Sequence, residues 1–319
     1  GDARGRRTLV IAEIDANDPR WVRGREVGGY GLDAHWSDDF HHAVHVALTG
    51  ERTGYYADFT ELGAVAKALG QRYVNDGRYS THRRRSHGRP AIDVPADRFV
   101  VCVQNHDQTG NRAGGERLAA LVSPEALRLA AALLLLSPYV PLLFMGEEHG
   151  ETNPFLYFVS HGDPALVEAV RAGRRREFES FGWAGEVPDP QSEETFEASR
   201  PRWERPESEA GARLRALYRD LLRLRRSEAA LRPGGSETRV RHDEAAGWVA
   251  VRYSREGEVL EAIFNLSTEA RMVALDQSCR WSQVLFTGAA EYGGPGEAVL
   301  DEGLRLPGHT AVLLRGAVA

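Results

Sequence analysis

The sequence has few cysteines and no long apolar run. Its two cysteines, Cys102 and Cys279, cannot form the disulfide framework of a small secreted protein, which favours a reducing compartment, the cytoplasm. The longest apolar run, residues 130–136, is far too short to cross a bilayer, and no secretory signal is recognisable. The net charge of -6 and the pI of about 6.0 give no reason to expect nucleic acid or an anionic membrane as a partner.

Sequence motifs for common cofactors and metals are absent as well. The chain contains no G-x-G-x-x-G after a strand, no phosphate-binding loop, no H-E-x-x-H and no C-x-x-C pair. His41, His42 and His45 are the one group that could suggest a metal, because His41 and His45 are one helical turn apart. No thiol or third spaced ligand accompanies them, so we expect no metal and no cofactor and assign these imidazoles a solvated or hydrogen-bonding role.

The order of apolar segments predicts strands that alternate with helices. Strands are expected within residues 8–12, 99–103 and 140–145, and helices within residues 40–48, 59–69, 124–136 and 213–226. Ser123 and Pro124 are a good helix start, as N-cap and first helical residue. Strand, helix and strand in this order are typical of a parallel sheet.

Other segments lack a helical period. Residues 31–42 and 181–210 are expected to be loops, and the basic segment 71–98, with Arg83–Arg85, is expected to be a solvated loop or, alternatively, a lid. After about residue 232 the period changes to alternation, which predicts a small antiparallel β-sandwich. We therefore expect two domains, residues 1–232 and 233–319.

Carboxylates follow two of the predicted strands. Glu13 comes directly after the first strand, and Asp107 follows the strand at residues 99–103. Chemistry at the carboxyl ends of strands is typical of a (βα) barrel, and two carboxyl groups are what glycoside hydrolysis needs. Trp36 offers an aromatic face on which a sugar could stack. By itself, a strand-terminal glutamate is equally well explained as a capping or ion-paired acid.

Several segments resemble a known family. Residues 101–107 are similar to the Asn-His-Asp strand of the α-amylase superfamily of glycoside hydrolases, and residues 10–19 are similar to its general-acid segment. Four longer segments resemble the maltooligosyltrehalose trehalohydrolases within it: residues 28–42, 105–112, 155–161, and 174–178 with 189–191.

This resemblance implies an α/β fold, a (βα)8 TIM-type barrel followed by an antiparallel β-sandwich. It also implies hydrolysis of the α-1,4-glucosidic bond next to the terminal trehalose of maltooligosyltrehalose, which releases trehalose. Maltooligosyltrehalose and maltooligosaccharides are therefore the expected ligands.

The resemblance also assigns roles to residues of this chain. Glu13 would be the general acid/base, and Asp107 would be the acid that holds the reacting sugar and stabilises the transition state. The expected substrate-binding residues are His106, Asn105, Trp36, Asp38, Asp39 and His41.

One part of the family pattern is not found. The nucleophile of the superfamily is an aspartate on the strand before the general-acid strand, and Asp2, in a segment rich in Gly and Arg, does not fit that context. We therefore expect this chain to contain the second half of the barrel and the sandwich. We expect it to be inactive alone and to need the missing N-terminal half of the same enzyme as a partner. A glucan branching or other transglycosylating enzyme and a non-catalytic carbohydrate-binding remnant are the alternatives.

Overall fold

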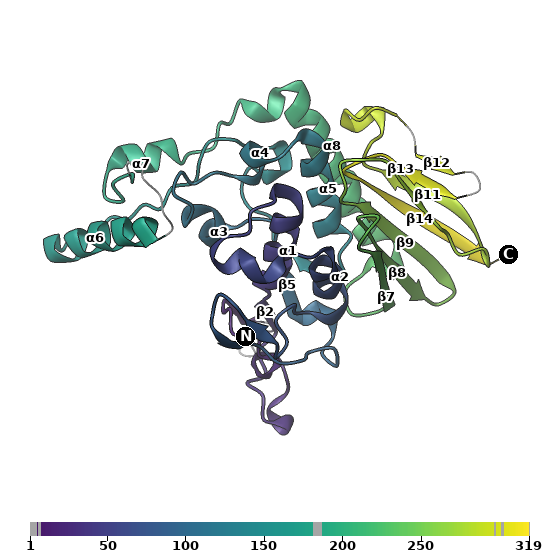
Figure 1. Ribbon diagram of the computed structural model, residues 1–319, viewed down its shortest axis with the longest axis horizontal. Coiled ribbons are helices and arrows are strands. Elements are labelled where there is room, and N and C mark those ends of the chain that lie inside the picture. The colour runs from purple at the N-terminus through teal and green to yellow at the C-terminus, as the bar shows by residue number, and fades with distance from the viewer. Residues whose placement is uncertain (1–4, 6–7, 181–186, 297, 301–302, 319) are drawn as a thin grey trace.

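The computed structural model describes residues 5, 8–180, 187–296, 298–300 and 303–318, so Asp2 lies outside it. The chain up to about residue 231 combines short strands with helices, and the rest consists almost entirely of strands. Figure 1 shows the antiparallel strands gathered on one side and helices α6 (Pro164–Ser180) and α7 (Glu193–Ala198) on the opposite side. In the described residues, no helix combines the length and the apolar character that a membrane span requires.

A four-stranded parallel sheet organises the first part. Its strand order, β1–β2–β5–β6, follows the order of the strands in the chain. The strands are β1 (Ile11–Ala12), β2 (Ala34–Trp36), β5 (Phe99–Val101) and β6 (Val140–Pro141). The three strands predicted from the sequence are confirmed, each shorter than expected. Because all four run in the same direction, their carboxyl ends lie at one edge of the sheet.

Strand β2 corrects the sequence interpretation, which assigned residues 31–42 to a loop. Ala34 and His35 pair with β1, and His35 and Trp36 pair with β5. The strand is only three residues long and contains a fully buried histidine, so neither hydrophobic alternation nor composition identified it. His35 is accommodated because its Nε2 contacts the Tyr73 hydroxyl at 2.5 Å.

The four predicted helices are confirmed, with ends shifted by a few residues. They are α1 (Asp38–Thr49), α2 (Leu62–Gln71), α5 (Pro124–Leu135) and α8 (Glu209–Ser227). The Ser123 hydroxyl accepts a hydrogen bond from the Ala126 N–H at 3.3 Å, which is the N-cap that the sequence predicted. Helix α5 is buried almost along its whole length, as its apolar composition requires.

Short helical segments complete the first part. The α-helices among them are α3 (His106–Gly110) and α4 (Leu118–Leu121). The 3-10 helices are η2 (Pro19–Trp21), η3 (Arg25–Val27), η4 (Gly54–Phe59), η5 (Ala96–Arg98), η6 (Glu147–His149), η7 (Arg205–Glu207) and η8 (Ala229–Leu231).

The prediction of a loop at residues 181–210 is wrong in part. Residues 181–186 lie outside the described residues, but α7 forms within the segment and α8 begins at its end. The Ser192 hydroxyl accepts a hydrogen bond from the Glu194 N–H at 3.2 Å, and two glutamates occupy the first turn of α7. This capping stabilises a helix that is too short to produce an apolar period.

The second part contains two antiparallel sheets, as the alternation predicted. The five-stranded sheet has the order β11–β14–β9–β8–β7, and the three-stranded sheet has the order β10–β13–β12. The strands are β7 (Glu237–Asp243), β8 (Trp248–Arg255), β9 (Glu258–Asn265), β10 (Arg271–Val273), β11 (Cys279–Phe286), β12 (Val299–Leu300), β13 (Leu304–Leu306) and β14 (Thr310–Val318), with η9 (Ala290–Tyr292) after β11.

The central strands of the five-stranded sheet are buried on both faces, whereas its outer strands β7 and β11 are partly exposed. Val251 and Tyr253 face a large core that also contains the buried residues of α5 and α8. Ala250 and Ile263 face the opposite way, toward Leu304 and other residues of the three-stranded sheet. The helices of the first part and the five-stranded sheet therefore share one hydrophobic core.

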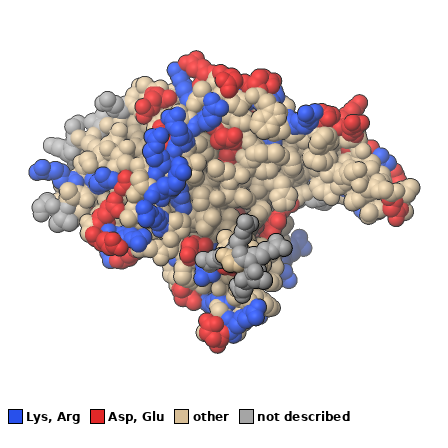
Figure 2. All heavy atoms as spheres, turned by 180° about the vertical axis from the view of Figure 1, so that it is seen from behind, with Lys and Arg blue, Asp and Glu red and all other residues tan. Residues whose placement is uncertain are grey.

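Helix α8 separates its apolar and basic residues on two faces. Leu217 and Leu221 are buried, whereas Arg215, Arg219 and Arg223, spaced four residues apart, are exposed. Figure 2, seen from behind, shows a band of Lys and Arg side chains along one face of the molecule.

One arginine of α8 is an exception to this pattern. Arg225 is buried, and its guanidinium donates to the backbone oxygens of Leu135 at 2.7 Å, Ser137 at 2.8 Å and Tyr139 at 2.6 Å. These oxygens lie at the end of α5 and in the turn toward β6. Arg225 thus satisfies carbonyl groups that the end of a buried helix leaves without a donor.

We expect Arg225→Met to lower the free energy of unfolding by about 3 kcal/mol, because three buried carbonyl oxygens lose their donor. Urea unfolding followed by circular dichroism measures the change. The control is Arg226→Met, because Arg226 is the exposed neighbour on the same helix, and it should cost less than about 0.5 kcal/mol. Equal losses in the two variants would contradict this role of Arg225.

Candidate active site

A cavity of about 720 Å³ lies at the carboxyl ends of β1, β2 and β5. Polar and aromatic side chains from the segments that follow these strands line it. Its carboxylate residues are Glu13, Asp15, Asp38, Glu51, Asp107 and Glu116. The edge of the sheet at which the sequence placed chemistry is therefore hollow and rich in acids.

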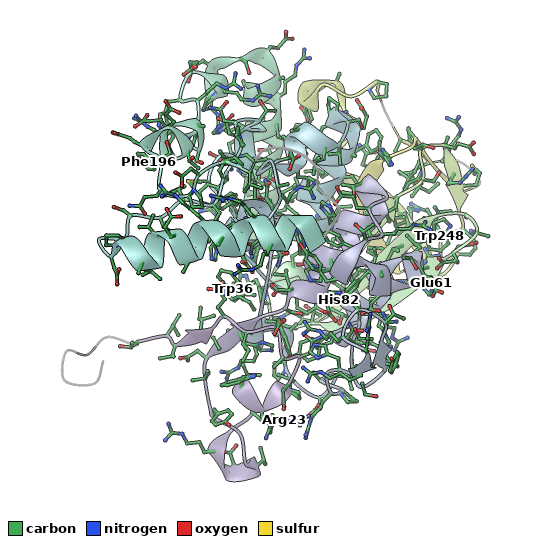
Figure 3. All side chains as sticks on the ribbon, turned by 60° about the vertical axis from the view of Figure 1, so that its left-hand side comes forward. Arg23, Trp36, Glu61, His82, Phe196 and Trp248 are labelled. Carbon is green, nitrogen blue, oxygen red and sulfur yellow. The ribbon has the colours of Figure 1, made fainter. Side chains whose placement is uncertain are left out.

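Glu13 and His106 meet beside this cavity. The Nε2 atom of His106 lies 3.5 Å from Oε1 of Glu13, and both side chains are about half exposed, at 54% and 55%. The Trp36 ring, which also lines the cavity and is labelled in Figure 3, meets the His106 ring edge-on at 6.1 Å. His106 thus links the carboxylate after β1 to the aromatic residue that ends β2.

Asp107 is placed by the short helix α3. The Asn105 side chain is the N-cap of this helix and accepts a hydrogen bond from the Gln108 N–H at 2.7 Å. Asp107 lies in the first turn, where the N-terminal helix dipole favours a negative charge. Its Oδ1 accepts a hydrogen bond from Nδ2 of Asn111 at 2.5 Å. Asn105, Asp107 and Asn111 all line the cavity.

Two adjacent acids at the start of α1 have different environments. Asp38 lines the cavity, and no hydrogen bond or ion pair from another described residue reaches its carboxyl group. Asp39 is buried, and its Oδ2 accepts hydrogen bonds from the backbone N–H groups of Val74 and Asn75, both at 2.7 Å, and from Nδ2 of Asn17 at 2.9 Å. Asp39 is therefore committed to holding neighbouring segments together.

His41 does not line the large cavity, whereas its neighbour His42 does. His41 is buried, its Nδ1 lies 3.0 Å from Nδ1 of His42, and its ring stacks on His45 at 5.4 Å. Burial lowers the pKa of His42 to about 3, with a further contribution from His45. Among the described residues, no group of three or more His, Cys, Asp or Glu side chains is arranged to hold a metal ion.

The structure adds aromatic residues that the sequence interpretation did not select. Tyr55, from η4, stacks on His42 with ring centroids 4.7 Å apart, and both line the cavity. Tyr56 lies next to it and stacks on His45 at 4.5 Å. The two tyrosines belong to the short 3-10 helix η4, whose sequence has no apolar period, so only the fold brings them to the site.

An ion-pair network also borders the cavity. Arg112 donates to both carboxylate oxygens of Glu51 at 2.8 Å, and His45 contacts Glu51 Oε2 at 2.8 Å. The hydrogen bonds from Arg112 and His45 hold the pKa of Glu51 well below its usual range. Glu51 is therefore charged and engaged, and it is not free to exchange protons with a ligand.

The basic segment 71–98 reaches the cavity. It contains a hairpin of β3 (Tyr79–Ser80) and β4 (Arg85–Ser86), and Arg83 in its turn contacts Asp15 at 2.6 Å. Burial would raise the pKa of Asp15, but hydrogen bonding and charge attraction from Arg83 lower it overall. His82, labelled in Figure 3, lines the cavity as well. The segment is therefore not a purely solvated loop, because part of it lines the cavity.

The surroundings of Asp38 oppose the loss of its proton. Burial raises the pKa of Asp38 to about 7, and the negative charges of Asp107, Asp15, Asp39 and Glu13 add to the effect. A carboxyl group in this state carries a proton for part of the time near neutral pH. It can then donate a hydrogen bond as well as accept one.

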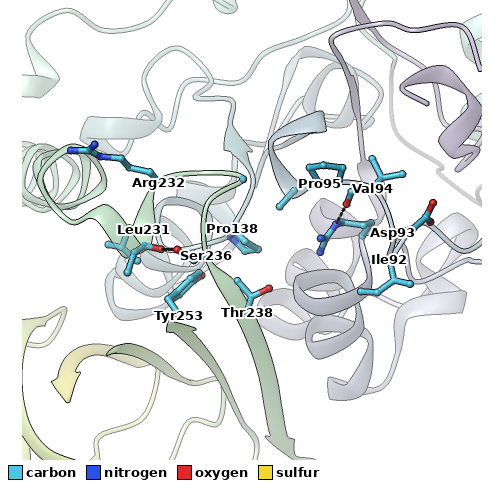
Figure 4. A pocket seen from close by; sticks show the side chains of 14 residues that line it. Ile92, Asp93, Val94, Pro95, Pro138, Leu231, Arg232, Ser236, Thr238 and Tyr253 are labelled. Carbon is cyan, nitrogen blue, oxygen red and sulfur yellow. Dashed lines mark hydrogen bonds between the residues drawn. The ribbon is translucent and has the colours of Figure 1, made fainter. Parts of the chain in front are cut away.

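A smaller cavity of about 260 Å³ offers no comparable chemistry (Figure 4). It lies where residues 92–96 meet Leu231 and Tyr253. Asp93 is the one carboxylate among its lining residues, and it is paired with Arg23 at 2.8 Å. We therefore place the candidate active site in the larger cavity.

Curated proteins similar to this chain are malto-oligosyltrehalose trehalohydrolases. The one from Rhizobium sp. (strain M-11) is 48% identical over 279 residues, which are 86% of this chain and 46% of that protein. The one from Saccharolobus solfataricus is 49% identical over 218 residues, which are 68% of this chain and 37% of that protein. The chain thus spans less than half the length of these relatives, and it matches their C-terminal part. No protein-family model matches the chain.

Solved structures agree with the sequence comparison. A candidate alpha amylase from Salmonella typhimurium is 32% identical and superposes with a TM-score of 0.81, covering 97% of this chain and 51% of that protein. The combination of an α/β part with a further β-sheet part is therefore that of α-amylase-like proteins.

The raised pKa of Asp38 predicts a pH dependence of stability. Between about pH 4 and pH 7 the folded chain keeps a proton on Asp38 that the unfolded chain has lost, so this residue makes the fold less stable as the pH rises. We therefore expect the difference in unfolding free energy between Asp38→Asn and the unmodified chain to grow by about 3 kcal/mol, in favour of the variant, from pH 4 to pH 7. Above that range the difference should not grow further.

Urea unfolding of both proteins at several pH values measures this difference. Other buried acids, such as Glu147 with its pKa raised to about 8 by burial, are present in both proteins and cancel. A difference that stays constant from pH 4 to pH 7 would show that Asp38 is ionised throughout.

Proposed function

The chain belongs to the malto-oligosyltrehalose trehalohydrolase family and matches the C-terminal part of its members, and we propose that its cavity is part of a glycoside hydrolase site. The proposed reaction is hydrolysis of the α-1,4-glucosidic bond next to the terminal trehalose of maltooligosyltrehalose, with release of trehalose. The observation that carries the proposal is that Glu13 and Asp107, from two different strand ends, open onto one cavity.

We assign Glu13 the role of general acid/base. Its carboxyl group is about half exposed, so a sugar ring in the cavity has access to it, and Nε2 of His106 lies 3.5 Å from its Oε1. A protonated carboxyl group can deliver a proton to the leaving glycosidic oxygen, and the resulting carboxylate can then activate water.

Asp107 is proposed to hold the hydroxyl groups of the reacting sugar and to stabilise positive charge in the transition state. Its position in the first turn of α3 and the hydrogen bond from Asn111 keep its carboxylate in one orientation. His106 and Trp36 are proposed to contact the same sugar, one by hydrogen bonding and the other by its aromatic face.

The remaining predicted binding residues divide into two groups. Asp38 and Asn105 line the cavity, so direct contact with the saccharide is supported for them, although the side-chain oxygen of Asn105 also caps α3. Asp39 and His41 lie behind the surface of the large cavity and are proposed to act indirectly, by holding the start of α1.

We further propose that the described residues do not include the nucleophile of a retaining mechanism. The resemblance to the α-amylase superfamily implies that this aspartate lies on the strand before the general-acid strand. In the described sheet β1 is an edge strand, so no described strand lies on its other side. Asp15, Glu51 and Glu116 are engaged with Arg83 or Arg112, which makes them poor nucleophiles.

The architecture that fits this proposal is half of a (βα)8 barrel, residues 1–232, followed by a β-sandwich, residues 233–319. The four parallel strands in chain order support the half barrel. Leu9, Val10 and Ile11 at the open edge of β1 are exposed, which supports pairing with further strands of the same enzyme. The cytoplasm remains the proposed location, on the grounds of cysteine content.

A second candidate function is carbohydrate binding without catalysis. The edge position of β1 and the engaged state of three of the cavity carboxylates favour it for this chain alone. Both candidate functions predict binding of a maltooligosaccharide, but only the hydrolase function predicts that the bound substrate is cleaved.

The first experiment measures binding of maltopentaose by calorimetry and release of trehalose from maltooligosyltrehalose. We expect the chain alone to bind the saccharide without releasing trehalose. Trehalose release would show that another carboxylate of this chain serves as nucleophile, and new branch points would identify a transglycosylase instead. Absence of any saccharide binding would rule out both candidate functions for this cavity.

The two proposed catalytic carboxylates should respond differently to amide substitution. We expect Asp107→Asn to raise the dissociation constant for maltopentaose about tenfold, because charged hydrogen bonds to the sugar are lost. Glu13→Gln should change it less than about threefold, because the acid/base acts on the transition state more than on the bound ground state. If both variants bind as tightly as the unmodified chain, Asp107 does not hold the sugar.

A further inference from the structure

Three of the segments that carry the family resemblance meet at one arginine. Residues 105–112 contain Asp107, whereas residues 155–161 and 174–178 have no part in the chemistry proposed above. Arg174 of α6 contacts the other two segments, at Asn111 and at Tyr157. This contact joins the helix that projects in Figure 1 to the candidate active site.

The Arg174 side chain is held on several sides. The residue is only 8% exposed, and its guanidinium lies over the Tyr157 ring at 4.6 Å from the centroid. Nη1 donates to Oδ1 of Asn111 at 2.8 Å, and Nη2 donates to the backbone oxygen of Gly110 at 3.0 Å. Burial of a cation is costly unless it is well paired, so this arrangement orients Arg174 strongly.

The contact with Arg174 determines which way the Asn111 amide points. A guanidinium can only donate, so the side-chain atom of Asn111 that faces Arg174 must be the amide oxygen. The NH₂ group of the same amide then points to Asp107, where Nδ2 lies 2.5 Å from Oδ1. An amide turned the other way would place an oxygen against the Asp107 carboxylate and an NH₂ group against the arginine.

We infer that Arg174 is a positioning residue for the active site and acts on Asp107 through the Asn111 amide. The inference rests on the proposed function, because it gives Asp107 the task of holding the sugar. Arg174 keeps Asn111 as a donor to Asp107 and thereby keeps the carboxylate in the orientation that the saccharide meets. The residue itself does not touch the saccharide.

A purely structural role for Arg174 makes a different prediction. Arg174 also donates to the Gly110 carbonyl, so it could do no more than fasten α6 to α3. In that case its loss should weaken the site by the same factor whether or not Asn111 is present. If it acts through Asn111, its loss should matter only while the amide is there.

The test is a double-mutant cycle on maltopentaose binding, measured by calorimetry with Arg174→Met, Asn111→Ala and the double variant. We expect each single variant to raise the dissociation constant about tenfold. Adding Arg174→Met to Asn111→Ala should raise it by less than about twofold. The matched control is Arg171→Met on the same helix, which loses the pairs with Asp189 and Glu168 but no contact with α3.

A spectroscopic measurement accompanies the cycle. The side-chain amide of Asn111, observed by ¹⁵N NMR and assigned with Asn111→Ala, should shift in Arg174→Met and stay unchanged in Arg171→Met. Circular dichroism confirms that each variant is folded.

Multiplicative losses in the cycle, or an equally large loss in Arg171→Met, would overturn the inference and leave the proposed function standing. An unmodified chain that binds no maltopentaose would overturn the proposed function, and the inference with it. Two results together support the inference that Arg174 acts through Asn111. Binding weakens in both single variants without further loss in the double variant, and the amide signal shifts in Arg174→Met but not in Arg171→Met.

Discussion

Parallel pairing of β1, β2 and β5 is the constraint on which the candidate site depends. Parallel strands must all end at the same edge of the sheet, so the segments that follow them meet there. Glu13 follows β1, Trp36 ends β2, and Asp107 lies in the short helix after β5. Residues almost a hundred positions apart thus share one cavity. The common direction of the strands brings these residues together.

The site is supported by polar side chains that have little freedom. Oδ2 of Asp39 accepts hydrogen bonds from Asn17 and from the backbone around Asn75, and Asn111 is held between Arg174 and Asp107. Each of these groups would be costly to bury without its partners. The residues that face the cavity and the residues that hold them in place are therefore of the same chemical types. Residue type alone does not show which of these two roles a residue has.

Much of the fold follows from local pattern. The apolar character of α5, the N-cap at Ser123 and the alternation after residue 232 are properties of neighbouring residues, and the structure confirms what they predict. Strand β2 and helix α7 were not predicted, because three residues, one of them His35, carry no readable period and because a six-residue helix depends on its cap. In both cases pairing or capping outweighs intrinsic propensity.

By itself, the sequence determined the alternation of strands and helices, the presence of carboxylates at two strand ends, and the resemblance to a family of glycoside hydrolases. The tertiary structure alone decided that Asp38 faces the cavity while Asp39 is buried, that Tyr55 reaches the site from the short 3-10 helix η4, and that Arg174 contacts Asn111. These outcomes depend on contacts between segments far apart in the chain. A local pattern records which residues lie on one face of an element, but it does not record which element that face will meet.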